Sequence, residues 1–125
     1  MLGTRKAVAN LATRDLEKSR LFFTDTLGLK EVDREGDELI VFASGDSNIN
    51  VYRSDFAGTN KATAVTWEVD DIEAEVAALK AKGVTFEHYD MDGLKLDGDV
   101  HVGDGMKVAW FKDPDGNILN IVGDA

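Results

Sequence analysis

The sequence predicts an α+β fold of two tandem βαβββ modules whose sheets curl around a central cleft. Three observations support this prediction. The order strand, helix, three strands can be read twice along the chain. Asp15 and Gly28, at the start and end of the first helix, recur as Asp71 and Gly83 at nearly the same offset, and each half ends in two apolar runs joined by a turn. Because one module cannot bury its sheet alone, the two must close on each other or on a second chain.

The last hairpin, 108–122, is the clearest of these signals. Two apolar runs flank residues 113–117, where Pro114 presets φ and Gly116 supplies the positive φ that closes a turn. The stretch 39–52 has the same arrangement around Gly, Asp and Asn residues. We interpret the turn as a hinge point for strand pairing and not as a catalytic element.

In the first module, residues 7–12 are typical of a strand, and Thr13 is the expected N-cap of a helix with acidic residues in its first turn. Gly28 ends this helix. Its apolar positions recur at helical spacing at Leu16, Phe23 and Leu27. Three more strands, separated by turn residues, are expected at 31–33, 38–43 and 48–53.

In the second module, residues 64–69 alternate like a strand, Asp70 and Glu73 form a capping pair, and Gly83 ends the helix. One face of this helix consists of Ile72, Val76 and Leu79. Three strands follow at 84–89, 107–112 and 118–122. The expected division is therefore a single domain, with module one at about 5–54, a linker at about 55–62 and module two at about 63–123.

Asn50 and Asn120, in the last strands of the two modules, are farther apart in the sequence than the two equivalent helix ends are. The second module is therefore about fifteen residues longer than the first. The extra residues lie in the segment 88–105, whose glycines and aspartates suggest a rim or lid, and an insertion of this length is consistent with a functional loop. Its Asp-x-Asp pairs lack the spacing of an EF-hand, so we interpret them as turns.

Composition and charge exclude several classes of function. The 125 residues include no cysteine, which excludes disulfides, thiolate zinc sites and a cysteine nucleophile and fits a reducing cytosol. The formal net charge of −10 repels phosphate backbones, so a nucleic-acid partner is not expected. The first fifteen residues contain frequent charges and no long apolar run, so we expect neither a signal peptide nor a membrane span, and a cytoplasmic location.

The doubled βαβββ unit, the helix start 15–19, the Leu27–Leu29 stop and the 113–117 turn together resemble the vicinal oxygen chelate superfamily. This superfamily includes glyoxalase I, extradiol dioxygenases, fosfomycin-resistance transferases and bleomycin-resistance proteins. The resemblance covers nearly the whole chain. It implies paired sheets around a cleft, which in the enzymes holds a divalent metal, and it implies a homodimer.

The resemblance also implies four metal-ligand positions, at the first and last strands of each module. In this chain they are Val8, Asn50, Ala64 and Asn120. Valine and alanine have no donor atom, and a neutral amide is a weak ligand for a catalytic divalent ion. We therefore expect no metal and no cofactor, and binding is favoured over catalysis, although enzyme activity stays open.

Strand alternation, together with the resemblance, predicts which side chains face the cleft. The predicted ligand-binding residues are Val8, Asn10, Asn50, Tyr52, Ala64, Thr66, Glu68, His101, Trp110 and Asn120. Each has an alternative interpretation. Trp110 can be a core residue, Asn50 and Asn120 can bond each other, and Glu68 can be a solvated charge at a strand end. The histidines, His88 and His101, are the first candidates for acid–base work but are more typical of a rim.

Three functions remain open. The favoured one is a binding protein that sequesters or carries a small organic compound, aromatic or cationic, as the bleomycin-resistance branch does. The alternative is a metal-dependent lyase, isomerase or dioxygenase that uses displaced ligands such as His88, His101 or Glu68. The third is an interaction module without a ligand, in which side chains of the chain itself plug the cleft.

Overall fold

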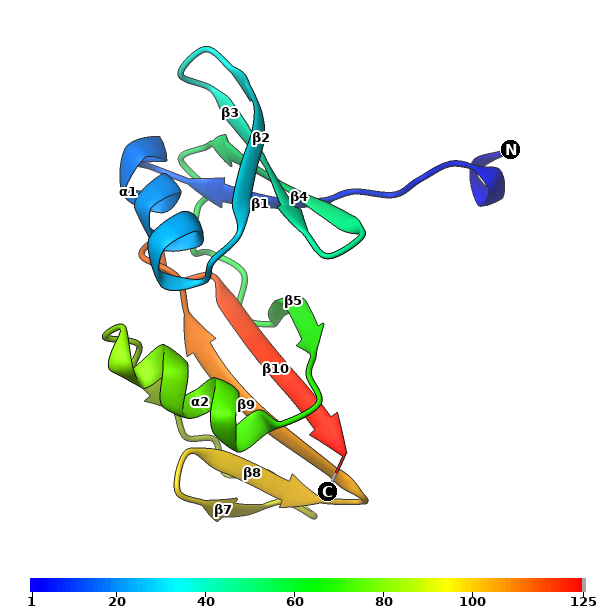
Figure 1. Ribbon diagram of the computed structural model, residues 1–125, viewed down its shortest axis with the longest axis vertical. Coiled ribbons are helices and arrows are strands. Elements are labelled where there is room, and N and C mark those ends of the chain that lie inside the picture. The colour runs from blue at the N-terminus through cyan, green and yellow to red at the C-terminus, as the bar shows by residue number, and fades with distance from the viewer. Residues whose placement is uncertain (125) are drawn as a thin grey trace.

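The computed structural model describes residues 1–124 and confirms the α+β fold with two modules, which are stacked along the long axis of the molecule (Figure 1). Module one forms a four-stranded sheet in the order β1-β4-β3-β2, called sheet A here. A short 3-10 helix, η1 (Leu2–Thr4), precedes it. Its elements are β1 (Ala9–Thr13), α1 (Leu16–Leu21), a π-helical turn η2 (Phe22–Thr26), β2 (Lys30–Glu35), β3 (Leu39–Ser44) and β4 (Ser47–Arg53).

Module two forms sheet B, in the order β5-β10-β9-β8-β7, with β6 also paired to β9. In both sheets the first strand of the module runs parallel to the last one, β1 with β4 and β5 with β10. The elements of module two are β5 (Thr63–Glu68), α2 (Ile72–Ala81), β6 (Phe86–Glu87), β7 (Lys95–Asp97), β8 (Val100–Gly103), β9 (Met106–Lys112) and β10 (Ile118–Asp124).

The two helices begin at equivalent aspartates. Asp15 accepts a hydrogen bond from the Lys18 backbone N–H, and Asp71 accepts one from that of Ala74, so each is the N-cap of its helix. The predicted Thr13 cap and the predicted Asp70–Glu73 capping pair are therefore wrong by a short shift in position. Thr13 is instead the fully buried last residue of β1.

Glycines end both helical segments where the sequence predicts. Gly28 follows η2 with φ +78°, and Gly83 follows α2 with φ +95°. Only glycine adopts this left-handed region without strain, so each residue allows the chain to turn away from the helix. The helices pack on one face of their sheets, around a shared core that includes Phe23, Phe42 and Phe111.

The insert of module two contains a β-hairpin, and its expected role as a rim or lid stays a prediction. β7 and β8 pair with each other, and β8 continues along β9, so the hairpin extends sheet B (Figure 1). The turns expected from its glycines are present, with positive φ at Gly93, Gly98 and Gly105. The strand predicted at 84–89 is reduced to β6, because the chain leaves β9 after Glu87 and returns to it as β8.

The 113–117 turn joins the two modules as well as β9 and β10. Asp115 accepts hydrogen bonds from the Arg14 backbone N–H at 2.9 Å and from the Ser19 hydroxyl at 3.3 Å. Asn117 donates to the Ala12 carbonyl of β1 at 2.8 Å. A second contact between modules lies at the β3–β4 turn, where the Trp67 indole N–H donates to the Ser44 hydroxyl at 2.9 Å.

Within residues 1–124, no helix has the length and apolar character needed to cross a membrane.

Candidate functional site

The face of sheet B opposite α2 presents a row of three side chains in register. Thr66 of β5 pairs with Asn120 of β10, and Asn120 pairs with Trp110 of β9. Directly paired residues project to the same side of a sheet, so the hydroxyl, the amide and the indole are neighbours. We call this side the open face of sheet B, and Trp67, Phe111 and Ile121 project from the opposite face because strand side chains alternate.

Asn120 is the unusual member of this row. It is 7% exposed, and its Oδ1 atom is buried without a hydrogen-bond partner within residues 1–124. A buried acceptor without a donor costs about 1–3 kcal/mol, so such atoms are rare in native proteins. Within one chain Asn50 donates no hydrogen bond to this oxygen, so the expected pairing of the two amides stays a prediction. The oxygen thus has an unused acceptor position at the side of Trp110.

An aromatic cluster lies beside Asn120. The Trp110 ring meets the His101 ring edge-on at 4.9 Å and the Tyr89 ring at 5.3 Å, measured between ring centroids. Trp110 is 9% exposed and its indole N–H donates to the Thr63 hydroxyl at 3.1 Å. Burial raises the pKa of the Tyr89 phenol above its usual value, so this hydroxyl is a neutral group. The cluster forms an apolar wall at one side of the amide.

His101 supports this wall and is not free to react. It is buried, its Nε2 accepts the Tyr89 backbone N–H at 2.9 Å, and its Nδ1 lies 3.3 Å from the Val108 carbonyl. This pattern corresponds to the tautomer with the proton on Nδ1. Both ring nitrogens are thus in use, which leaves neither for a metal ion or for proton transfer.

His88, the other histidine, lies outside the site. Its Nε2 is 2.8 Å from Asp99, which also pairs with Lys80 of α2 at 2.7 Å. Lys80 first, and then His88, hold the pKa of Asp99 below its usual value. This exposed network connects the hairpin to α2, so we interpret it as a clamp on the β7–β8 hairpin.

Module one has an equivalent row on its own open face, formed by Asn10, Asn50 and Val41. This row differs in exposure, because Asn50 is only half-buried and Asn10 is exposed. Next to it an open groove of about 560 Å³ is lined by Asn10, Glu35, Glu38, Leu39, Tyr52 and Arg53. No aromatic wall comparable to the one in module two is found here among the described residues.

The other predicted site residues lie at the edges of the sheets. Val8 precedes β1 and is half-buried, and Ala64 and Glu68 are exposed on the edge strand β5. The structure thus brings together Thr66, Trp110, His101 and Asn120 in module two, and Asn10, Asn50 and Tyr52 in module one. The groove beside the module-one row is lined by module one only, and a hollow at the end of sheet B, around Glu68 and Val122, is lined by module two only.

The four positions do not fit a divalent metal. Val8 and Ala64 have no donor atom, Asn50 and Asn120 offer neutral amides, and His101 has both nitrogens engaged. Across residues 1–124, no group of three or more His, Cys, Asp or Glu side chains is placed to hold an ion.

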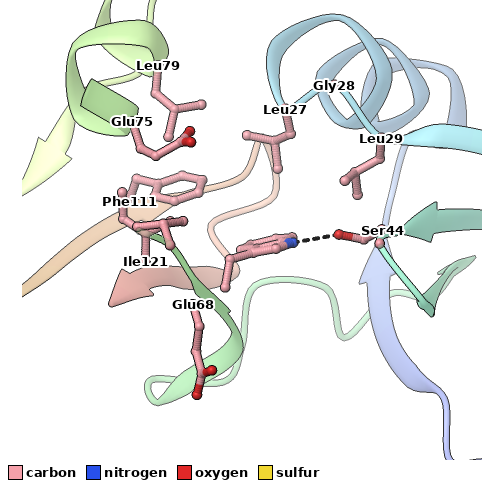
Figure 2. A pocket seen from close by; sticks show the side chains of 12 residues that line it. Leu27, Gly28, Leu29, Ser44, Glu68, Glu75, Leu79, Phe111 and Ile121 are labelled. Atoms are coloured by element: carbon pink, nitrogen blue, oxygen red, sulfur yellow. Dashed lines mark hydrogen bonds between the residues drawn. The ribbon is translucent and has the colours of Figure 1, made fainter. Parts of the chain in front are cut away.

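Sequence reasoning missed two features. The first is Tyr89, which belongs to the aromatic wall. The sequence indicated its neighbour His88, which lies outside the site, and not Tyr89 itself. A groove of about 320 Å³ between the modules, on the helix side of sheet B, was not foreseen because it depends on how the modules pack (Figure 2).

Comparison with known proteins identifies the family. The model of the Glyoxalase/Bleomycin resistance protein/Dioxygenase superfamily matches residues 6–121. The chain belongs to this superfamily. The resemblance inferred from the sequence is therefore confirmed, including the fold that it implies.

The match to an individual curated protein covers only part of the chain. A manganese-dependent 2,3-dihydroxybiphenyl 1,2-dioxygenase of Geobacillus genomosp. 3 is 37% identical over 76 residues, which are 58% of this chain and 24% of that protein. The chain spans about a quarter of the length of that relative.

Two crystal structures show the same fold at low identity. A lactoylglutathione lyase from Agrobacterium tumefaciens has a TM-score of 0.71 at 16% identity, over 96% of this chain and 93% of that one. A bleomycin resistance determinant encoded on the transposon Tn5 has a TM-score of 0.70 at 21% identity, over 97% of this chain and 98% of that one. At these identities the likeness concerns the fold alone.

Proposed function

We propose that this protein binds and sequesters a small aromatic compound on the open face of module two, without a catalytic metal. The observation that supports this most is the buried, unpaired Oδ1 of Asn120 beside the aromatic wall. An aromatic ring that packs against Trp110 and donates an O–H or N–H to this oxygen would satisfy both features at once. Glu68 at the edge of the same face would favour a ligand with positive charge.

We propose further that a second copy of the chain completes the site. Asn10 and Tyr52 are exposed on the open face of module one, and Thr66 and Glu68 are exposed on that of module two. A ligand seated on one such face alone would stay largely open to water, whereas small-molecule sites usually bury most of the ligand surface. A homodimer in which module one of one copy covers module two of the other would supply the missing wall.

Binding can be tested with the Trp67→Phe variant, which leaves Trp110 as the only tryptophan. We expect phenol-type compounds, with 2,3-dihydroxybiphenyl as the first probe, to change the Trp110 fluorescence saturably. Biphenyl, which lacks the hydroxyl donors, is the matched control and should bind at least about tenfold more weakly, the equivalent of one charge-free hydrogen bond. If Trp110 fluorescence does not change with any compound of a broad panel of hydroxylated and amino aromatics, the proposal is wrong.

A second candidate function is cleavage of a dihydroxylated aromatic ring by a dioxygenase, and the relative from Geobacillus favours it. It can be tested by adding Mn²⁺ to the purified protein with 2,3-dihydroxybiphenyl in air and measuring oxygen consumption. Turnover that a chelator abolishes, together with stoichiometric metal by elemental analysis, would establish this function and overturn sequestration. We expect the substrate to be bound and recovered unchanged.

A further inference from the structure

The groove between the two modules lies on the side of sheet B that faces away from the proposed ligand site. Its floor consists of Trp67, Phe111 and Ile121, each adjacent in sequence to a residue of the open-face row and therefore on the opposite face. Residues Leu27–Leu29 of module one and Leu79 of α2 form its walls (Figure 2). The volume of about 320 Å³ is within the range of small-molecule sites.

The floor of the groove is aromatic and held in place. The Trp67 and Phe111 rings are stacked with centroids 6.5 Å apart and planes inclined by 21°. The hydrogen bond from the Trp67 indole to Ser44, drawn as a dashed line in Figure 2, fixes the indole between the two modules. Trp67 and the leucines beside it are only partly buried, so apolar surface is presented to whatever enters the groove.

The charge of the groove has one sign. Glu75 extends from α2 with its carboxylate over the Phe111 ring, and Glu68 is the other ionisable residue of the lining (Figure 2). Within residues 1–124, Glu75 forms no ion pair and no side-chain hydrogen bond. Lys82, which follows α2 and is not part of the lining, donates to the Asp25 carbonyl at 2.7 Å.

We propose that this groove is a second binding site, for a small organic cation with an apolar or aromatic body. Aromatic faces attract a cation placed over them, and a carboxylate in the same groove adds a direct charge interaction. The net charge of −10 raises the local concentration of any such cation around the protein. This site lies on the opposite face of sheet B from the open-face site, with Glu68 at the edge of both, and each contains one of the two tryptophans, Trp67 here and Trp110 there.

The experiment uses benzyltrimethylammonium as the probe and the Trp110→Phe variant, in which Trp67 alone reports. We expect a saturable change of Trp67 fluorescence with this cation, at least about tenfold weaker binding of its neutral isostere neopentylbenzene, and no binding of benzenesulfonate. Glu75→Gln should weaken cation binding about tenfold while keeping the shape of the groove. Asp37→Asn, which removes the same charge from an exposed turn of module one, should leave the affinity unchanged.

Because Trp110 is a buried residue, a second measurement uses the unaltered chain. Its two indole N–H signals can be followed by NMR, and the Trp67 signal is identified as the one that moves in Ser44→Ala. The proposal requires the cation to shift the Trp67 signal. A shift of the Trp110 signal alone would place the cation at the open-face site and would overturn the proposal. Equal binding by Glu75→Gln and the native chain, or binding of benzenesulfonate, would also overturn it, and neither result would bear on ligand binding at Asn120.

Discussion

Asn50 and Asn120 occupy the same place in the two modules, in the last strand of each, but their surroundings differ. Asn50 is half-buried between the exposed Asn10 and Val41. Asn120 is buried next to Trp110, and its oxygen has no partner among the described residues. Both amides lie between a parallel first strand and an antiparallel neighbour, so the difference arises from what packs on each sheet.

The source of the difference is the insert of module two. Its residues Tyr89 and His101 pack against Trp110, and its hairpin extends sheet B beyond the four strands of module one. Module one has no such addition, and its open face stays polar and accessible. The comparison indicates that the repeated fold provides two equivalent sheets, and that the insert adds an aromatic wall to only one of them.

The largest effect is expected where the insert packs most tightly. A Cβ added at Gly103 of β8 would lie 1.9 Å from the Gly93 carbonyl oxygen, a backbone atom that cannot move aside cheaply. Gly103→Ala should therefore lower the free energy of unfolding by about 3 kcal/mol, measured by urea denaturation. Gly3→Ala, where a Cβ meets nothing within 4 Å, is the control. A loss below about 0.5 kcal/mol would show that β8 does not lie against the Gly93–Leu94 segment of the insert as described.

The next effect is expected in the 113–117 turn, which joins β9 and β10. Asp113 is buried and accepts hydrogen bonds from the backbone N–H groups of Asp115 and Asn117 and from the Asn117 amide. Asp113→Asn replaces one acceptor oxygen by a donor, so we expect a loss of about 2 kcal/mol at neutral pH by thermal or urea unfolding. Asp46→Asn, in the exposed turn of module one, should be nearly neutral.

The pH dependence of this loss has a definite sign. Burial raises the pKa of Asp113 above its usual value of 3.8, against the lowering effect of its hydrogen bonds with Asn117 and Asp115. A raised pKa in the folded state means that the contribution of this group to stability is fully present below 3.8 and is lost as the pH rises through the folded pKa. The stability difference between wild type and Asp113→Asn should therefore widen as the pH falls from neutrality. A difference that narrows would contradict this.

A smaller effect of opposite sign is expected at Asn120. Leucine has a similar length and no polar atom, so Asn120→Leu removes the unpaired oxygen and should stabilise the protein by about 1 kcal/mol while it weakens binding of hydroxylated aromatics. Asn50→Leu, at the equivalent place of module one, should change stability by less than about 0.5 kcal/mol because that amide is in contact with water. Thermal unfolding and fluorescence titration of both variants measure the contrast. Destabilisation by Asn120→Leu would mean that the amide is satisfied.

The smallest effect is expected at the contact between the modules. Ser44→Ala removes the acceptor for the Trp67 indole N–H, and because Trp67 is partly exposed, water can replace it. The expected loss is about 0.5 kcal/mol. In a double-mutant cycle with Trp67→Phe the two losses should not add, since both remove the same bond. Additive losses would show that the two modules are not held together by this bond.

Much of the fold could be predicted because it depends on local patterns. The strand order, Gly28 and Gly83 as helix ends and the 113–117 turn all follow from residue types at fixed positions. The caps were misplaced by one or two residues, because Thr13 and Asp70 suit an N-cap as well as their neighbours do. The hairpin of the insert was missed because 95–103 is too short and too polar to show strand alternation.

The site was predicted less completely, for a physical reason. Strand alternation together with the family resemblance predicted that Trp110 and Asn120 face the cleft, and the register of the strands shows them to be directly paired. What the sequence could not show is burial. The unpaired oxygen of Asn120, the engaged ring of His101 and the groove at Trp67 depend on contacts between distant segments.

The central claim is that a ligand reaches the amide of Asn120. The most direct measurement is the NMR signal of the Asn120 side-chain amide, assigned by its loss in Asn120→Leu, during titration with 2,3-dihydroxybiphenyl in the presence of a chelator. We predict a saturable shift of this signal, and no shift of the Asn50 signal before the site on module two is filled. Binding that leaves the Asn120 signal unmoved, or that disappears when the chelator removes a metal ion, would contradict the account.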